Sequence, residues 1–176
     1  CCICAMFKEE LKKIKGFVFD VDGVFTDGKI FIFSEGKQVR NMNVKDGYAV
    51  HYAIKKGFPV GIITGGRCDS IKYRFGDLGV KDIYIASDDK RKDLDHFLKK
   101  NNLGLNEVLY MGDDIPDYLI MKNVAIACCP ENAAPEIKQI SHYISPYKGG
   151  EGCVRDVIEQ TMKVKGIWMT SDAFVW

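Results

Sequence analysis

The sequence predicts an α/β fold: a doubly wound, Rossmann-like parallel sheet with a β-hairpin flap after the first strand and no cap domain. Three observations support this prediction. Short β-rich apolar runs alternate with segments of helical periodicity, which is the pattern of a parallel sheet. Clusters of polar residues follow these runs, where sheets of this kind bind ligands. The length of 176 residues fits one domain, 1–176, with a substantial hydrophobic core.

The strands are expected at residues 17–19, 60–63, 83–85, 108–111 and 124–127. The first helix after a strand is expected to end at Gly57, because basic residues precede this glycine and Pro59 opens the next strand. Two later helices show an apolar stripe that should pack on the sheet. The stripe of the shorter one is Leu94, Phe97 and Leu98, and that of the longer one is Val154, Val157, Ile158, Thr161 and Met162.

Two segments depart from the alternation of strands and helices. Residues 29–33 and 38–40 predict a β-hairpin, closed by a turn at 34–37 that contains Gly36. The C-terminal residues 167–176 are too apolar for a free end, so we expect them to dock on the body of the chain or on a neighbouring subunit.

Composition limits the classes of function. The net charge is +1, so no overall field favours nucleic acid or an anionic membrane as partner. No apolar run is long enough to span a bilayer, and a cytoplasmic protein is expected. Seven cysteines, an odd number in crowded positions, do not resemble a disulfide framework and predict reduced thiols. We expect Met6 to be the natural start and residues 1–5 to be an N-terminal extension.

Polar residues follow four of the expected strands in chain order. Because the carboxyl ends of parallel strands meet at one edge of a sheet, these side chains are expected to converge. The first pair stands one residue apart, at the end of the first strand, where Gly23 permits a bend. The converging residues are Asp20, Asp22, Thr64, Lys90, Asp113, Asp114 and Asp117.

Two carboxylates at a strand end can divide the work of hydrolysis, because one can attack while the other transfers protons. So many carboxylates in one place would repel each other, and a divalent cation is the natural compensation. Oxygen ligands favour Mg²⁺. The sequence therefore predicts a Mg²⁺-dependent phosphatase site.

These residues, in this order, resemble the four motifs of the haloacid dehalogenase-like phosphohydrolases. By that resemblance Asp20 attacks phosphorus to give an aspartyl-phosphate, and Asp22 protonates the leaving alcohol and then activates water. Thr64 binds a phosphoryl oxygen and Lys90 offsets the charge of the intermediate. The resemblance implies Mg²⁺ bound by the carboxylates of Asp20 and Asp113 and the backbone carbonyl of Asp22, with Asp114 and Asp117 as outer groups.

Other interpretations of the same residues remain open. Taken singly, Thr64, Asp114 and Asp117 could cap helices, and Lys90 could be a solvated residue of a first helical turn. A receiver-type signalling domain also has a phosphate-accepting aspartate, a Mg²⁺ site, a hydroxyl and a lysine. Such a receiver lacks an acid two residues after the acceptor, so Asp22 favours the hydrolase.

The intervals between the motifs leave no room for a cap domain, since only the hairpin is inserted between Asp22 and Thr64. This narrows the resemblance to the 3-deoxy-D-manno-octulosonate 8-phosphate phosphatases, homotetramers of lipopolysaccharide sugar synthesis. That resemblance implies hydrolysis of this sugar acid phosphate to the free sugar acid and phosphate. It also implies a homo-oligomer in which residues 149–155, a glycine-rich segment, reach over the site of a neighbouring subunit.

A sugar acid phosphate presents a carboxylate and hydroxyls, which suit arginine, amide and carboxylate partners. The family's pattern departs here at Gly66, where an arginine is common after Thr-Gly, and at His51, which replaces a frequent arginine. A nonulosonate 9-phosphate is the alternative substrate, and Gly66 argues against it. The substrate contacts implied by the resemblance are Asn43, Asp46, Gly47, His51, Gly65, Arg67, Arg74 and Arg155.

Overall fold

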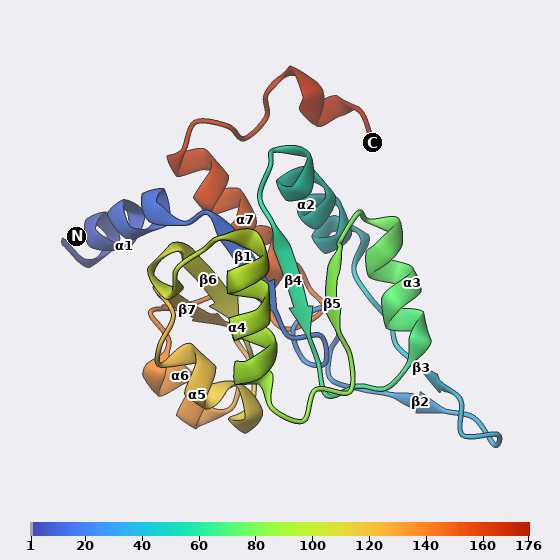
Figure 1. Ribbon diagram of the computed structural model, residues 1–176. Coiled ribbons are helices and arrows are strands. Elements are labelled where there is room, and N and C mark those ends of the chain that lie inside the picture. The colour runs from blue at the N-terminus through green and yellow to red at the C-terminus, as the bar shows by residue number, and fades with distance from the viewer. Residues whose placement is uncertain (1) are drawn as a thin grey trace.

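The computed structural model describes residues 2–176, with side chains from residue 6 onward (Figure 1). The first residue of the expected extension 1–5 lies outside the described part, and residues 2–5 belong to the first helix. The helices are α1 (Cys2–Lys13), α2 (Val44–Lys55), α3 (Asp69–Asp77), α4 (Lys90–Asn101), α5 (Tyr118–Met121), α6 (Pro135–Ile140) and α7 (Cys153–Val164), with 3₁₀ turns η1 (Leu105–Glu107), η2 (Ile115–Asp117) and η3 (Ser171–Phe174). The strands are β1 (Gly16–Phe19), β2 (Phe31–Ile32), β3 (Gln38–Val39), β4 (Val60–Ile63), β5 (Asp82–Tyr84), β6 (Val108–Met111), β7 (Ile126–Cys129) and β8 (Tyr143–Ile144).

Six strands form one parallel sheet in the order β5-β4-β1-β6-β7-β8, which confirms the predicted doubly wound fold. The chain runs outward from β1 in one direction and then returns to build the other half. The point of reversal is the gap between β1 and β6, where such sheets bind ligands. The strand predicted at 124–127 lies two residues later than expected, and β8 was missed because two residues carry no readable pattern.

Helices cover both faces of this sheet (Figure 1). Phe17 and Phe19 of β1 belong to a core shared with α1, α2, α3 and α7, whereas Val18 points into a second core with α4, α5 and α6. Because both faces are buried, the central strands are apolar at every position, as parallel strands usually are. The two predicted apolar stripes on α4 and α7 are buried, as expected.

The C-terminal residues dock on the body of their own chain. The hydroxyl of Tyr52 in α2 donates to the carbonyl of Ile167 at 3.0 Å, and Lys56 forms an ion pair with Asp172 at 2.6 Å. Gly57 ends α2 with φ of +87°, the left-handed conformation predicted for it. No helix in the described residues is long and apolar enough to cross a membrane.

The predicted hairpin is present, although its paired part is short. β2 and β3 are antiparallel, with Phe31 opposite Val39, and Gly36 closes the turn with φ of +77°. The hairpin projects away from the sheet (Figure 1), and Phe31, Ile32 and Phe33 are each more than half exposed. Within residues 2–176 this hairpin is the sole insertion between β1 and α2, so the body carries no cap domain there.

Candidate active site

An open cleft of about 840 Å³ lies at the carboxyl ends of the central strands. It is the convergence that the sequence predicts. The predicted residues that line it come from the loops after β1, β4 and β6 and from the first residue of α4: Asp20, Asp22, Thr64, Gly65, Lys90, Asp113 and Asp114.

Asp20 stands at the end of β1 and is almost completely buried. One carboxylate oxygen accepts from the amide of Val21 at 2.7 Å, and the other forms an ion pair with Lys90 at 2.8 Å. The chain then turns at Gly23, whose φ is +83°. A Cβ at Gly23 would lie 1.9 Å from a carboxylate oxygen of Asp113, so only glycine fits between these two loops.

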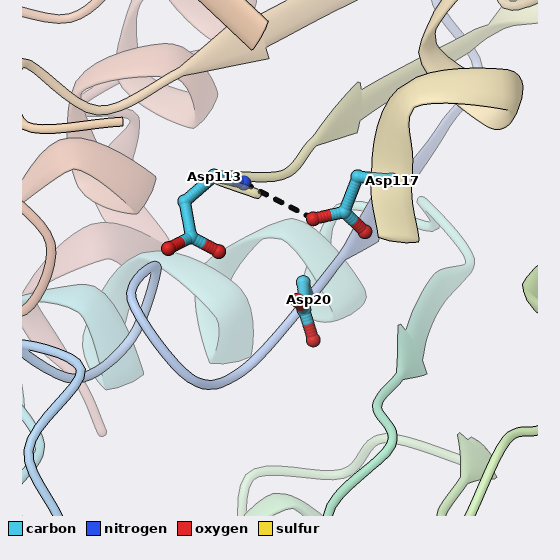
Figure 2. Close-up of side chains that lie close together, drawn as sticks. All are labelled: Asp20, Asp113 and Asp117. Atoms are coloured by element: carbon cyan, nitrogen blue, oxygen red, sulfur yellow. Dashed lines mark hydrogen bonds between the residues drawn. The ribbon is translucent and has the colours of Figure 1, made fainter. Parts of the chain in front are cut away.

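Lys90 bridges two carboxylates, since it also contacts Asp117 at 2.7 Å. Asp117 is fully buried and accepts from the hydroxyl of Tyr110 at 2.6 Å. It also accepts from the amide of Asp113 at 3.1 Å (Figure 2). Gly112 makes room for it, because a Cβ there would lie 2.4 Å from the Asp117 carboxyl carbon. Asp117 therefore anchors Lys90, and it also takes part in capping η2, since the amide of Asp114 donates to it at 3.5 Å.

The loops after β4 and β5 are tied together on the other side of the cleft. Thr64 is buried, and its hydroxyl accepts from the amide of Gly66 at 3.1 Å. Ala86 has φ of +53°, an uncommon conformation for a residue with a side chain. This turn lets the amide of Ser87 donate to the carbonyl of Thr64 at 3.0 Å. The two loops thereby bring Thr64 and the start of α4 to the same cleft.

Asp22 is held by a residue that sequence reasoning missed. Arg40, just after β3, contacts both of its carboxylate oxygens, at 2.6 Å through Nε and at 3.1 Å through Nη2. Tyr110 was missed as well, since it lies inside a buried strand. The one available signal for Tyr110 was a hydroxyl in an otherwise apolar run, because a buried hydroxyl usually has a hydrogen-bond partner.

The carboxylates of Asp20, Asp113 and Asp117 lie near a single buried ammonium group, that of Lys90. Burial and the charge of Asp117 raise the pKa of Asp20 despite the opposing effect of Lys90. Burial, Asp117 and Asp114 likewise raise the pKa of Asp113 to about 7. Burial opposes the charge of Lys90, yet its two carboxylate partners outweigh burial and raise its pKa. With every group ionised, three carboxylates and one ammonium leave two negative charges uncompensated, which a divalent cation would match.

Side-chain oxygens of Asp20, Asp113 and Asp117 lie within 4.8 Å of one another, close enough to hold a metal ion. The oxygens of Asp117 already accept from Lys90, Tyr110 and backbone amides, so this residue suits an anchoring role. Asp20 and Asp113 face the cleft and fit the oxygen-rich donor set that Mg²⁺ requires. The residues present thus fit the predicted metal.

Most of the expected substrate contacts lie outside this cleft. Arg67 is exposed and stands 3.8 Å from Asp88, at the rim. The expected role of Asp46 is corrected, because this residue is fully buried and its carboxylate accepts from the amide of Arg155 at 2.8 Å. Burial raises the pKa of Asp46 to about 6, although the hydrogen bonds that its carboxylate accepts from backbone amides act to lower it. Asp46 caps the start of α7 and has no surface to offer a substrate.

The other expected contacts have partners within their own subunit. Asn43 caps α2 by accepting from the amide of Lys45 at 2.9 Å. Gly47 leaves space for Arg74, whose Nη2 would lie 2.4 Å from a Cβ there. His51 stacks on Trp176, with ring centroids 5.3 Å apart, and Arg155 lies over the rings of Tyr48 and Trp168.

The glycine-rich segment 149–155 packs against the active-site loop of its own chain, and its expected reach over a neighbouring subunit stays a prediction. The amide of Gly150 donates to the carbonyl of Val24 at 3.0 Å. A Cβ at Gly149 would lie 2.0 Å from the carbonyl oxygen of Gly23. The glycines therefore permit a close approach of two backbones beneath the cleft.

Comparisons with known proteins agree with this fold. Residues 79–158 match the family model of the haloacid dehalogenase-like hydrolases. A 3-deoxy-D-manno-octulosonate 8-phosphate phosphatase from Yersinia pestis is 33% identical over 146 residues, covering 83% of this chain and 78% of the relative. The phosphatase of the same name from Escherichia coli K12 is 30% identical over 155 residues, covering 88% and 82%.

Among solved structures, the 3-deoxy-D-manno-octulosonate 8-phosphate phosphatase from Moraxella catarrhalis has a TM-score of 0.88 at 31% identity, covering 92% of this chain and 94% of that one. That crystal holds a magnesium ion, a phosphate ion and a KDO molecule. A doubly wound sheet with Asp20, Asp22, Lys90 and Asp113 in one cleft fits a phosphate-ester hydrolase, because a receiver-type domain lacks the second acid. The chain belongs to the haloacid dehalogenase-like hydrolases, and it is a phosphatase whose described residues, 2–176, include no cap domain.

Proposed function

We propose that this phosphatase hydrolyses 3-deoxy-D-manno-octulosonate 8-phosphate to the free sugar acid and phosphate, with Mg²⁺, as a step of lipopolysaccharide sugar synthesis. The observation that carries the proposal is the meeting of Asp20, Asp22, Lys90 and Asp113 in one cleft. The chain in which they meet is about 30% identical, over most of its length, to relatives named for this reaction.

In the proposed mechanism Asp20 attacks phosphorus and forms an aspartyl-phosphate while the sugar alcohol departs. Asp22 gives its proton to the departing oxygen and then takes one from the water that cleaves the acyl phosphate. Lys90 contacts Asp20 at 2.8 Å, so it can orient the nucleophile and offset the negative charge of the intermediate. Thr64 lines the same cleft and can donate its hydroxyl to a phosphoryl oxygen.

Mg²⁺ would be held by the carboxylates of Asp20 and Asp113 and the backbone carbonyl of Asp22. When bound, the cation polarises the phosphoryl group and shields its charge from the nucleophile. Asp114 accepts from the amide of Ile115 at 2.8 Å and faces the cleft, where it can orient water. Asp117 keeps Lys90 in place from beneath.

We extend the proposal to self-association, as a homotetramer. The cleft is open, and Phe31, Ile32 and Phe33 of the hairpin expose apolar side chains that a second copy would cover. Arg74 and Arg155 lie outside the cleft of their own chain, so contact with substrate would require another subunit. Sedimentation analysis tests this part, and a chain that is monomeric yet still selective refutes it.

A cytoplasmic location belongs to the same proposal. Cys68, Cys128, Cys129 and Cys153 are free cysteines, which suits a reducing compartment. A nonulosonate 9-phosphate remains the second candidate substrate, since it carries the same kinds of group. Gly66 is the feature that favours the octulosonate.

The decisive experiment is a screen of octulosonate 8-phosphate, a nonulosonate 9-phosphate and common sugar phosphates, with Mg²⁺ and with chelator. We expect the highest kcat/KM for the octulosonate, with activity lost on chelation. Replacement Asp20→Asn should abolish turnover while urea unfolding remains that of a folded chain. Equal kcat/KM for all substrates would refute the substrate, and turnover by Asp20→Asn would refute the nucleophile.

A further inference from the structure

Asp22 is bound by a two-point ion pair that comes from the hairpin. Nε and Nη2 of Arg40 reach its two carboxylate oxygens at 2.6 and 3.1 Å. Such a planar pairing fixes the orientation of a carboxylate as well as its position. The side chain of Arg40 is 3% exposed and that of Asp22 is 31% exposed, so the arginine is covered while the carboxylate faces the cleft.

Arg40 is the least exposed basic side chain among the ion pairs of the described residues. Nη1 of Arg40 is buried and has no hydrogen-bond partner in the part of the chain that the structure describes. The other bond of Nη2, to Gln38, is long at 3.4 Å. Asp22 is therefore the principal compensation for burying the guanidinium, and this raises the pKa of Arg40. Burying a guanidinium that has only one charged partner costs free energy, because the group loses its contacts with water.

The place of Arg40 joins three parts of the site. Its backbone follows β3 at the base of the hairpin, and its guanidinium reaches the loop after β1. Nη2 also lies 3.3 Å from the position that a Cβ on Gly66 would take, as does the hydroxyl of Thr64. The guanidinium thus stands between Asp22 and the loop that carries Thr64.

We propose that Arg40 is the positioning residue for Asp22 and aims its carboxylate at the leaving-group side of the cleft. This inference rests on the proposed acid-base role of Asp22. Arg40 does not touch the reacting atoms, and it acts through Asp22. It contacts both oxygens of the ionised carboxylate, and it holds one oxygen when the other carries the proton for the leaving group. The hairpin thereby has a part in catalysis within its own subunit.

The consequence depends on the leaving group. An alkyl phosphate such as a sugar phosphate releases a strongly basic alkoxide that needs a proton as the bond breaks. An aryl phosphate such as p-nitrophenyl phosphate releases a stable phenolate and needs little help. A misplaced Asp22 should therefore slow alkyl phosphates far more than aryl phosphates, whereas general damage to the site slows both alike.

The experiment compares kcat/KM for the best sugar phosphate and for p-nitrophenyl phosphate, because kcat/KM reports the step in which the leaving group departs. For Arg40→Ala we expect a loss of about 10 to 100-fold with the sugar phosphate and about 3-fold or less with p-nitrophenyl phosphate. Arg40→Lys keeps the charge but loses the two-point contact, so it should restore part of the loss. Lys37→Ala removes another cation from the same hairpin and should leave both values unchanged.

Equal losses with the two substrates, or no loss with either, would overturn the proposal. Urea unfolding of each variant separates misfolding from misplacement, since an unfolded Arg40→Ala loses both activities together. The variant Asp22→Asn separates the proposal from its basis. If Asp22→Asn does not change the ratio of the two kcat/KM values, the acid-base role of Asp22 fails, whatever Arg40 does.

Discussion

Gly149 supports the active-site loop from beneath, and replacing it with alanine tests that contact. The added Cβ would lie 2.0 Å from the carbonyl oxygen of Gly23, 2.6 Å from its carbonyl carbon and 2.7 Å from the carbonyl oxygen of Thr26. All three are backbone atoms, so no flexible side chain can move aside. The two loops must separate by about 1 Å or more to reach ordinary contact distances.

The displacement would also affect Asp113. A carboxylate oxygen of Asp113 lies 1.9 Å from where a Cβ of Gly23 would stand, so the same loop contacts Asp113 closely. A movement of the loop relative to Gly149 should therefore change its contact with Asp113. Overpacking of this kind costs about 1–3 kcal/mol of unfolding free energy. A shift of about 1 Å at a reacting group can reduce kcat by about 100-fold.

The matched control is Gly76→Ala. Gly76 lies in α3 with nothing within 4 Å of its potential Cβ, so alanine there should be neutral or slightly stabilising. Urea unfolding and kcat measured on both variants check the reasoning. If Gly149→Ala unfolds at the same urea concentration and turns over like the parent while Gly76→Ala behaves as expected, the close contact does not exist in solution.

Two further predictions concern the charges of the site. Asp117→Ala leaves Lys90 and the hydroxyl of Tyr110 without their common partner, so unfolding free energy should fall by about 3–5 kcal/mol in urea titrations; Tyr110→Phe should cost only about 1 kcal/mol, and equal losses would contradict the anchoring role. Burial raises the pKa of Asp113 to about 7 and that of Asp20 to about 8, so the metal-free folded state holds extra protons; the stability that these protons confer is present below about pH 4 and is lost as pH rises through these two values. Mg²⁺ competes with these protons, and calorimetry should show a larger rise of Tm on adding Mg²⁺ at pH 8 than at pH 5; a rise independent of pH would argue against binding at these carboxylates.

The convergence of the site was predictable because each of its main residues directly follows a strand with a clear apolar pattern. Asp20, Thr64 and Asp113 stand one or two residues beyond buried strands, and parallel topology brings such ends together. Lys90 begins a helix whose apolar stripe is also legible. If the strands form one parallel sheet, their positions in the sequence are therefore enough to predict which residues reach the cleft.

The remaining contacts depend on packing between distant segments, for which one sequence carries no signal. The carboxylate of Asp46 accepts from the amide of Arg155, which is 109 residues away in the sequence. An exposed aspartate at this position would suit substrate binding, but the buried Asp46 caps a helix instead. Arg40 reaches Asp22 only because a short hairpin returns the chain to β1 at a particular angle. A hairpin pattern predicts pairing of its strands and does not predict where its base side chains point.

The absence of a cap between β1 and α2 raises the question of what keeps the catalytic loop rigid. Gly149 approaches it from below, Asp113 abuts it at Gly23, and Arg40 grips the carboxylate of Asp22. Two of these contacts exist only because a glycine has no Cβ: Gly149 meets backbone atoms of the loop, and Gly23 meets the carboxylate of Asp113. Electrostatic catalysis needs groups that are already in place when charge develops. The contacts of Gly149, Asp113 and Arg40 hold the loop after β1 in place, and they leave the entrance of the cleft open to substrate.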